Sequence, residues 1–419
     1  MNKVPLSKVC DYSNASTNVS SLTLDTFIST DNMLPNRGGI VDAVNLPPAI
    51  TCPKVEIEDI LLSNIRPYFK KIWHATFEGG CSTDVLVLKC KNEKYNSKYV
   101  YYSLFQDLFF KHMMNGAKGS KMPRGDKDQI MTFLLTEYPK SYQEKIAEFL
   151  STIDDKIALN SRINNELEQM AKTIYNYWFV QFDFPNEEGK PYKTSGGEMV
   201  WNEELKRDIP MGWEVKSLYD IAIYTNGLAM QNHRPTSVNS LPVIKIKEMN
   251  EGYSNATEFA KSDFEDDYIV YEGDVLFSWS ASLNVMLWAD KKGALNQHIF
   301  KVTSKEYPRF FYYHQIANYL NHFKQMAANR KTTMGHITKD HLIESRICVP
   351  DDKTIIEKCG KQVEDILNLL VKNKMQNHEL MAQRDFLLPL LMNGQVKIKE
   401  EEEESLLMAA EPQAEYNKK

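Results

Sequence analysis

The stretch SYQEKIAEFLSTIDDKIALNSRINNELEQMAKTI, residues 141–174, decides the fold of this protein because a matching stretch follows later in the chain. Apolar and asparagine residues recur in it at alternating spacings of four and three, which predicts a long helix with a heptad seam. The later stretch, TIIEKCGKQVEDILNLLVKNKMQNHELMAQRDFL, occupies residues 354–387 and repeats the pattern 213 positions on. We therefore expect two long helices of one design.

The two seams carry asparagines at equivalent places, and we expect the helices to pair through them. At 1.5 Å per residue, a helix of about 40 residues is about 60 Å long, too long to fold back entirely onto its own domain. Antiparallel pairing would bring the asparagines together in a buried polar layer that fixes the register. In the alternative, they face solvent. The seam consists of Ile146, Leu150, Ile153, Ile157, Asn160, Asn164 and Leu167 in the first helix, and of Val363, Ile366, Leu370, Asn373, Asn377 and Leu380 in the second.

One residue, Arg384, breaks the second seam. Both helices nevertheless open on the same signal, since Ser141-x-x-Glu144 and Thr354-x-x-Glu357 each have the form of a capping box. These two signals predict that the helices begin at equivalent places in a repeated unit.

Shorter similarities extend the repeat to the rest of the chain. They keep nearly the same offset and the same order, which favours a duplicated domain over chance. The matching segments are Pro5–Val9 with Ser217–Ile221, Glu58–Ser63 with Glu272–Ser278, and Lys127–Ile130 with Lys339–Leu342.

The resulting fold class is α+β, with two pseudo-symmetric mixed α/β domains, each followed by a long helix. Short apolar runs such as Val85–Leu88, Leu241–Ile244 and Ile299–Val302 predict strands, and aromatic stretches over Tyr99–His112 and Arg309–Phe323 predict helices with buried rings. The expected divisions are a first domain over 1–140, its helix over 141–181, a Pro- and Gly-containing linker over 182–209, a second domain over 210–350, its helix over 351–395 and a disordered acidic tail over 396–419.

Composition points to a protein of the cytoplasm. The 419 residues contain six scattered cysteines and no C-x-x-C spacing of the kind that zinc and redox sites use. No apolar run approaches the roughly 20 residues that span a bilayer, and the first 20 residues lack the apolar run of a secretory signal. We therefore expect no membrane association.

Charge is uneven along the chain although the formal net charge is -6. Residues 60–130 hold 12 Lys and Arg against 6 Asp and Glu, and residues 291–346 hold 10 against 3. Much of the compensating acid lies elsewhere, including the run Glu400–Glu404. Two separate basic stretches, one in each half, are typical of contact with a polyanion.

Three loops carry the candidate binding residues. Mobile cations suit backbone phosphates, whereas Asn, Gln and Arg suit the edges of bases. Solvated surface loops are the alternative reading for each of these residues. The candidate phosphate contacts are Lys118, Lys121, Arg124, Arg330 and Lys331, and the candidate base contacts are Gln231, Asn232, His233 and Arg234.

Catalytic motifs are not found. The segment Gly116–Lys121 falls short of a phosphate-cradling P-loop, and no H-E-x-x-H metal motif or nucleophile elbow occurs. The segment Asn45–Ala49 only superficially resembles the base-binding motif of DNA methyltransferases, because no aromatic residue follows its prolines. We therefore expect no catalytic residue and no metal site, which favours a binding protein.

These features together resemble the specificity subunit of type I restriction-modification enzymes. The resemblance covers nearly all residues to about 395 and is carried by Ile209–Val215 (IPMGWEV), Gly273–Ser280 (GDVLFSWS) and Met381–Gly394. It implies that each domain is a target-recognition domain that reads one half of a split double-stranded DNA site. It also implies that the helices form an antiparallel coiled coil that spaces the halves and docks methylation subunits.

The resemblance further implies that catalysis belongs to partners. Two methylation (M) subunits would bring S-adenosylmethionine and adenine N6 methylation, and restriction motor-nuclease (R) subunits would bring ATP, Mg and DNA cleavage. This chain would hold no cofactor. Two rival readings remain at this point: a self-contained restriction-methylation enzyme with an unrecognised catalytic region, and a coiled-coil scaffold without a nucleic-acid role.

Overall fold

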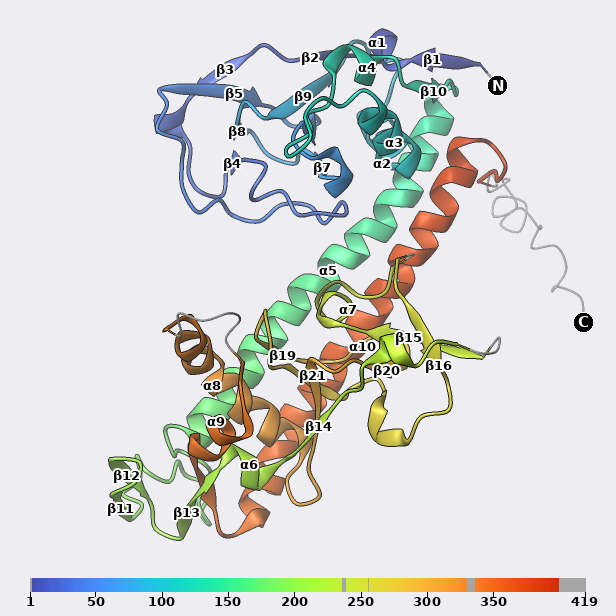
Figure 1. Cartoon of the computed structure of the whole chain (residues 1–419). Helices are drawn as coiled ribbons and strands as arrows, with labels where there is room; N and C mark the ends of the chain where they lie inside the picture. The colour runs from blue at the N-terminus through green and yellow to red at the C-terminus, as the bar shows by residue number, and fades with distance from the viewer. Residues whose placement is uncertain (1, 236–238, 255, 330–335, 399–419) are drawn as a thin grey trace, which may run out of the picture. The chain divides into compact units, whose positions relative to one another are not determined.

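The computed structural model describes residues 2–235, 239–254, 256–329 and 336–398 (Figure 1). The chain forms two compact units: unit 1 comprises Met1–Asp155 and Leu380–Lys419, and unit 2 comprises Lys156–Glu379. Two long helices, α5 (Lys140–Phe179) and α10 (Lys353–Met392), each contribute to both units. Each unit therefore contains a β region together with part of α5 and part of α10.

Unit 1 is built on two four-stranded sheets and one short strand pair. The first sheet is antiparallel throughout, and the second contains one parallel pair, between β4 and β8. The strands of the first sheet lie in the order β2 (Cys10–Tyr12), β9 (Val85–Cys90), β6 (Ile60–Ser63), β7 (Ile72–His74). Those of the second lie in the order β3 (Ser16–Asn18), β5 (Thr51–Val55), β8 (Gly79–Cys81), β4 (Phe27–Ile28). The pair consists of β1 (Lys3–Pro5) and β10 (Leu134–Thr136).

Helices cover the first sheet of unit 1 and fill its core with aromatic rings. The single helix predicted over Tyr99–His112 is wrong, because the backbone is extended at Gln106 (ψ 148°) and divides the segment into α2 and α3. The core also takes in the C-terminal end of α10, at Leu388, Leu391 and Met392. The short helices of this unit are α1 (Leu6–Val9), η1 (Val19–Ser21), η2 (Pro67–Phe69), α2 (Ser97–Phe105), α3 (Asp107–Asn115) and α4 (Lys127–Met131).

Unit 2 repeats the antiparallel sheet and the strand pair of unit 1, whereas its second sheet has its parallel pair at the centre, between β15 and β20. Its antiparallel sheet has the corresponding strand order, and β13 pairs with β22 as β1 pairs with β10. The strands of the antiparallel sheet lie in the order β14 (Ile223–Asn226), β21 (Ile299–Thr303), β18 (Val275–Ser278), β19 (Asn284–Leu287). Those of the second sheet lie in the order β16 (Phe259–Lys261), β15 (Ser240–Ile244), β20 (Gly293–Leu295), β17 (Ile269–Val270). The pair consists of β13 (Trp213–Ser217) and β22 (Arg346–Pro350).

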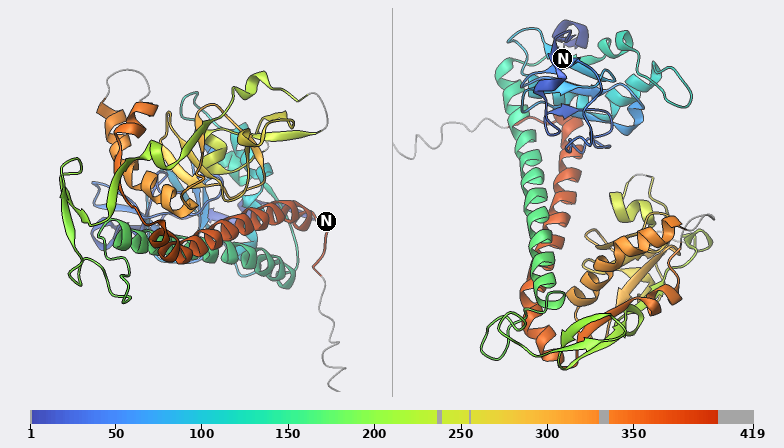
Figure 2. Two further views of the ribbon diagram at one scale, coloured as in Figure 1. Left: turned by 90° about the horizontal axis from the view of Figure 1, so that it is seen from below. Right: turned by 90° about the vertical axis from the view of Figure 1, so that its left-hand side faces the viewer.

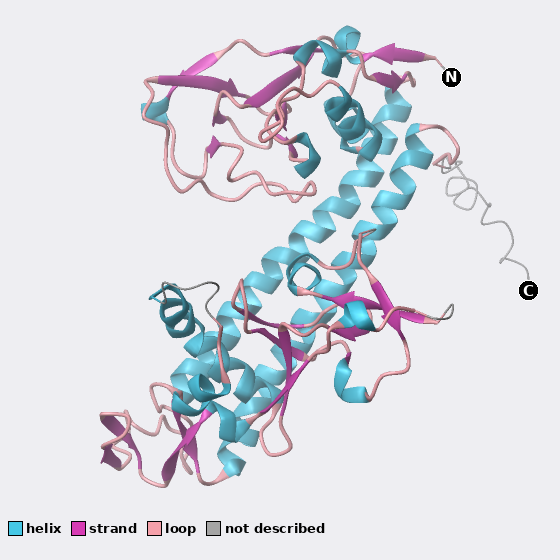
Figure 3. Cartoon of the chain, in the orientation of Figure 1, coloured by secondary structure: helices cyan, strands magenta, loops and turns pink. Residues whose placement is uncertain are grey.

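Helices and strands alternate in unit 2 (Figure 3), and two of its short helices occupy the same places in the order of elements as helices of unit 1. α6 follows the first strand of its β region as α1 does, and α9 precedes the last as α4 does. The predicted fold class, with two β regions that are each followed by a long helix, is confirmed. The helices are α6 (Leu218–Ile221), η3 (Met230–Asn232), α7 (Ile246–Glu251), η4 (Asp266–Tyr268), α8 (Arg309–Asn329) and α9 (Lys339–Glu344).

The segment expected as a linker, residues 182–209, is an integral part of unit 2. It forms the hairpin of β11 (Met199–Asn202) and β12 (Arg207–Pro210), and Phe182, Phe184 and Ile209 are buried in the core of this unit. Phe182 meets the ring of Trp213 edge to face at a centroid distance of 5.2 Å. The segment is thus ordered by burial of its apolar side chains, although its prolines and glycines are typical of a linker. Most of the acidic tail expected over 396–419 lies outside the described residues.

The long helices begin close to the predicted places, but the predicted caps are wrong. Ser141 and Thr354 lie inside the first turns of α5 and α10 rather than before them. The Oδ1 atom of Asp352 instead accepts a hydrogen bond from the backbone amide of Thr354 at 2.9 Å. Within the described ranges, none of the helices combines the length and the apolar character that crossing a membrane would require.

Candidate nucleic-acid interface

The four seam asparagines lie together in unit 2, where α5 and α10 run side by side (Figure 2). Asn160 donates its side-chain amide to the Oδ1 atom of Asn377 at 2.9 Å, and Asn373 donates to the Oδ1 atom of Asn164 at 3.0 Å. Asn164 also donates to the carbonyl of Leu370 at 3.4 Å. Positions that rise along α5 meet positions that fall along α10, so the helices are antiparallel.

The apolar seam follows the predicted positions in α5 and drifts from them in α10. Leu367 is buried one residue after the predicted Ile366, because an α-helix has 3.6 rather than 3.5 residues per turn, and Val371 is buried beside the predicted Leu370. Ile366 is only half-buried. Among the other predicted seam residues, Ile146, Leu150, Leu370 and Val363 are buried, and Ile153, Ile157, Leu167 and Leu380 are half-buried.

Arg384, which the sequence placed as a break in the seam, is buried in unit 1 and compensated there. Its side chain is 8% exposed and pairs with Asp154 at 2.7 Å, and the guanidinium lies 4.6 Å from the centroid of Phe105. Asp154 also accepts a hydrogen bond from the hydroxyl of Tyr102 at 2.7 Å. The residue that interrupts the apolar seam therefore forms a buried ion pair, and its carboxylate partner is held by a further hydrogen bond. The spacing of residues in the sequence could not reveal this partner.

The basic loop of unit 1, residues 116–126, closes on itself through its backbone. Lys118 and Arg124 exchange two backbone hydrogen bonds of 3.0 and 2.9 Å. The Lys118 side chain is 84% exposed and pairs with Asp126 at 2.9 Å, and Arg124 pairs with Asp84 at 3.1 Å. Lys121 is exposed and forms no ion pair among the described residues. This geometry presents three predicted cations on one loop.

Electrostatics within the basic loop distinguish its cations. The hydrogen bond from Lys118 to Asp126 raises the pKa of the lysine and lowers the pKa of the carboxyl. A phosphate would have to compete with Asp126 for Lys118 and with Asp84 for Arg124. Lys121 faces no such competition from a described acidic partner, so we regard it as the most available cation of the loop.

A second element, the aromatic turn of residues 64–70, lies against the basic loop. The backbone amide of Arg66 donates to the carbonyl of Pro123 at 2.8 Å, and the amide of Gly125 donates to the carbonyl of Asn64 at 3.1 Å. Tyr68 and Phe69 follow with exposed rings. Sequence reasoning missed this turn, because it reaches the basic loop only through backbone hydrogen bonds between residues far apart in the chain. The one signal in the sequence that included it was the excess of positive charge over residues 60–130.

The polar loop of unit 2, residues 226–234, exposes three of its four predicted side chains. Gln231 and Asn232 are exposed on the 3-10 turn η3, which the buried Met230 anchors. His233 is half-buried, with its ring 5.5 Å from that of Phe264. Arg234 is exposed but pairs with Glu258 at 3.3 Å. The remaining predicted cations, Arg330 and Lys331, lie outside the described residues.

An aromatic cluster that sequence reasoning also missed lies beside the polar loop. The indole N–H of Trp279 donates to the Oδ1 atom of Asn226 at 2.9 Å. The rings of His298 and His336 each lie 5.5 Å from that of Trp279. Strand pairing between β18 and β21 brings Trp279 and His298 together, and this pairing is not visible in the spacing of the sequence.

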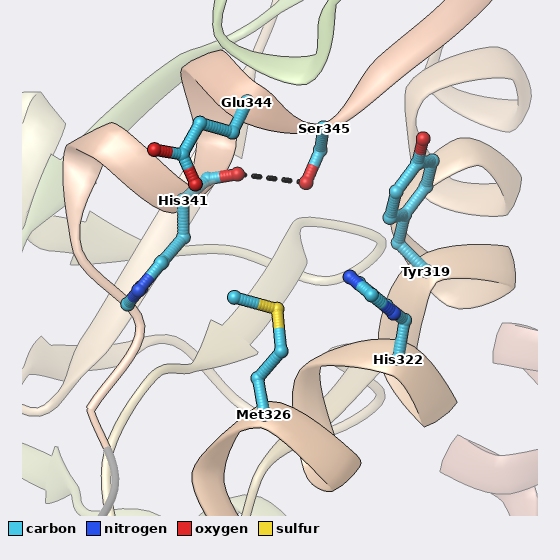
Figure 4. Close-up of a pocket in the computed structure, with 6 residues that line it drawn as sticks. All are labelled: Tyr319, His322, Met326, His341, Glu344 and Ser345. Atoms are coloured by element: carbon cyan, nitrogen blue, oxygen red, sulfur yellow. Dashed lines mark hydrogen bonds between the residues drawn. The ribbon is translucent and has the colours of Figure 1, made fainter. Parts of the chain in front are cut away.

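A pocket of about 320 Å³ opens between α8 and α9 of unit 2 (Figure 4). None of the predicted binding residues lines it. Ser345 donates to the carbonyl of His341 at 2.7 Å, so part of its polar lining is occupied with holding α9. In the described part of the chain, no group of three or more His, Cys, Asp and Glu residues is placed to hold a metal ion. The lining residues are Tyr319, His322, Met326, His341, Glu344 and Ser345.

Comparisons with known proteins show the family and the fold of the chain. The family model described as "Type I restriction modification DNA specificity domain" matches residues 48–169 and 210–380. The MjaIX specificity subunit of Methanocaldococcus jannaschii is 26% identical over 316 residues, covering 73% of this chain and 70% of its own length. The HindI specificity subunit of Haemophilus influenzae is 22% identical, covering 88% and 94%. The crystal structure of the type I system S subunit from M. genitalium shares the fold, with a TM-score of 0.55, 13% identity and coverage of 93% and 96%.

Proposed function

Because the chain belongs to the type I restriction-modification DNA specificity family, we propose that its two units read the two halves of a divided DNA target. As a member of this family, the protein is the specificity subunit, the non-catalytic component that recognises DNA for a type I system. The proposal adds where each half of the target is read. We assign residues 1–140 and 210–350 as the two target-recognition domains.

One observation carries the proposal: the same antiparallel strand order occurs twice, and each copy presents an exposed loop that suits DNA. In unit 1 this loop holds Lys118, Lys121 and Arg124. In unit 2 it holds Gln231 and Asn232. Two similar β regions within one chain suit a target with two separate parts.

The side chains of the loops suit two kinds of contact with DNA, to phosphates and to bases. Lysine and arginine side chains neutralise phosphates and supply affinity without sequence choice, so we assign phosphate contacts to the basic loop of unit 1 and to Arg330 and Lys331. Asparagine and glutamine side chains can form two hydrogen bonds to one adenine, so we assign base contacts to Gln231 and Asn232. His233 and Arg234 flank them in the same loop.

Partner subunits supply the reactions in this proposal. Two methylation subunits bring S-adenosylmethionine, and the restriction motor-nuclease subunits bring ATP and Mg. We assign α5 and α10 as the connection between the two readers and as the docking element for methylation subunits. The polar layer of Asn160, Asn164, Asn373 and Asn377 fixes the register of this connection.

Mapping methylated adenines tests the proposal directly. The chain is co-expressed with its methylation subunits, and modified adenines are located across the genome by long-read sequencing. We expect a motif of two specified parts separated by unspecified bases. Replacing residues 210–350 by the corresponding domain of a relative should change one part only. A continuous motif, or a change in both parts, would overturn the assignment.

Two further measurements address the rival functions. The purified chain alone, incubated with DNA and labelled S-adenosylmethionine, is expected to transfer no methyl group, and transfer would establish a self-contained enzyme. The assembled complex is expected to bind mixed-sequence DNA with an affinity that falls as salt rises. Binding to DNA that does not depend on this chain would favour a scaffold.

A further inference from the structure

Two cysteines of unit 1 face each other across neighbouring strands. Cys10 in β2 and Cys90 in β9 are register partners, and their sulfur atoms are 3.7 Å apart. Backbone hydrogen bonds run from Lys91 to Val9 at 2.9 Å, directly beside the cysteine pair, and from Ser13 to Val87 at 2.8 Å, three positions along the ladder on the other side. Hydrogen-bonded pairs alternate with non-hydrogen-bonded pairs in an antiparallel ladder. The cysteines therefore occupy a non-hydrogen-bonded pair of the ladder.

This position has the backbone spacing that a disulfide needs. The Cα atoms of a non-hydrogen-bonded antiparallel pair are about 4.5 Å apart. Disulfides join Cα atoms that are usually about 4.4–6.8 Å apart. The bond can therefore form by rotation of the two side chains, without separating the strands.

The two thiols differ in access and in acidity. Cys10 is fully buried, whereas Cys90 is half-buried and reachable from solvent. The hydrogen bond between them lowers the pKa of Cys90 and raises that of Cys10. Because the thiolate is the nucleophile in thiol chemistry, Cys90 has the properties of the attacking residue and Cys10 those of its resolving partner.

The other four cysteines provide a contrast within the same chain. All are buried, and burial raises the pKa of each thiol, to about 12 for Cys81 and Cys348 and to about 11 for Cys359. No other pair of cysteines is opposed in strand register among the described residues, because Cys52 is paired with Thr17, Cys81 with Ile28 and Cys348 with Val215. Selective oxidation of the chain should therefore begin at Cys90.

We propose that Cys10 and Cys90 form a reversible oxidation site. The two thiols become a cross-strand disulfide by exchange with a low-molecular-weight disulfide. The Cys90 thiolate attacks one sulfur of the small disulfide, forms a mixed disulfide and releases one small thiolate. Cys10 then loses its proton and attacks the Cys90 sulfur, which releases the second small thiolate. The two protein thiols are oxidised, and one small disulfide is reduced to two thiols.

The bond would fasten an edge strand. β2 lies at the edge of its sheet and pairs only with β9 among the described strands. The disulfide would hold β2 on β9 covalently, so that the N-terminal segment could not leave the sheet. Oxidation should therefore protect this segment from protease rather than disrupt unit 1.

Peptide mapping of the full-length chain tests the proposal. The folded protein is incubated with glutathione disulfide, digested without reductant and analysed by mass spectrometry. We expect a linked peptide pair containing Cys10 and Cys90, loss of two of the six titratable thiols, and recovery of both on reduction. Absence of this link in the folded protein, or its formation at an equal rate with any other cysteine pair, would overturn the proposal.

Two serine variants separate the roles of the thiols. Cys10→Ser should trap glutathione on Cys90, and Cys90→Ser should leave Cys10 unmodified. Cys359→Ser, at a buried cysteine outside the pair, is the matched control and should link Cys10 to Cys90 as the unaltered chain does. Glutathione found on Cys10 in the Cys90→Ser protein, with circular dichroism unchanged, would contradict the assigned order of attack.

Discussion

Asn160 donates its side-chain amide to the Oδ1 atom of Asn377 at 2.9 Å, and the two residues are 2% and 7% exposed. A buried amide without a partner destabilises a folded protein by about 1–3 kcal/mol. Here the partner comes from the other long helix. This hydrogen bond is formed in one register of the antiparallel pair, so it selects that register over others with similar apolar contacts.

Replacing one asparagine of the layer should destabilise unit 2. Asn160→Ala leaves the buried Oδ1 atom of Asn377 without its donor and opens a small cavity, so we expect a loss of about 1–3 kcal/mol in the free energy of unfolding. Urea unfolding measures it. Asn165→Ala, at an exposed asparagine of the same helix, is the matched control and should change the stability by less than about 0.5 kcal/mol. Equal losses in both variants would contradict the layer.

Removing Arg384 should destabilise unit 1 because it breaks the buried ion pair with Asp154. Arg384→Ala leaves the Asp154 carboxylate without its cation in a partly buried site, and we expect a loss of about 3 kcal/mol in unit 1. Asp385→Ala removes the other, half-exposed carboxylate that Arg384 contacts and should cost less than about 1 kcal/mol. The comparison is made by urea unfolding. An equal cost for the two variants would show that Asp154 is not the significant partner.

The basic loop of unit 1 should supply affinity without sequence choice. Lys121→Ala is expected to weaken binding of the assembled complex to target and non-target DNA by the same factor, and to reduce the slope of log affinity against log salt by about one. Fluorescence anisotropy over a salt series measures both. Lys206→Ala, at an exposed lysine of the β11–β12 hairpin, is the control. An unchanged slope in Lys121→Ala would remove the loop from the interface.

The polar loop of unit 2 should supply sequence choice in one half of the target. Gln231→Ala and Asn232→Ala are each expected to reduce discrimination against a substituted base by about 1–3 kcal/mol. Competition binding with singly substituted targets locates the affected position. Uniform weakening on every sequence would instead identify the loop as a phosphate contact.

The stability of unit 2 should fall on acidification through a buried histidine. His314 stacks on Tyr175 at a centroid distance of 4.7 Å and donates from Nδ1 to the carbonyl of Phe310 at 2.8 Å. Burial lowers the pKa of His314 from 6.5 to about 4. The folded protein therefore keeps this ring neutral at a pH where the unfolded chain protonates it, and the stability is complete above pH 6.5 and declines toward pH 4.

The size of the decline has an upper bound of about 3 kcal/mol, at about 1.4 kcal/mol for each tenfold difference in proton affinity. Urea unfolding between pH 7 and pH 4 measures it in the unaltered chain and in His314→Leu. The variant should lose less stability over this interval, even if it begins from a lower value. Parallel curves would assign the decline to other groups.

The repeated sequence pattern was sufficient to predict the architecture. The strand-forming runs, the matching short segments and the two heptad seams are local signals, and the elements that they predict occur at equivalent places in both units. In α10 the buried position falls on Leu367, one residue after Ile366, since a strict heptad does not follow the turn of a straight helix.

The candidate site was harder to predict because long-range pairing builds it. The turn at Arg66 joins the basic loop through the backbone of Pro123, and Trp279 meets Asn226 across the sheet. Neither contact has a signature in residue spacing. Charge was likewise overestimated, because counting Lys118 and Arg124 as cations ignores the carboxylates of Asp126 and Asp84 that the fold brings to them.

The C-terminal turns of α10 contribute Leu388, Leu391 and Met392 to the core of unit 1. During synthesis on the ribosome, the β region of unit 1 emerges before that of unit 2 but cannot complete its core until Leu388, Leu391 and Met392 have been translated. The second β region has all of its own segments earlier, so it can finish first although it is made second. A chain that ends at residue 379 and has been released from the ribosome should hold a protease-resistant unit 2 and an unfinished unit 1. A chaperone that shields the β region of unit 1 would have to act until the end of α10 has emerged.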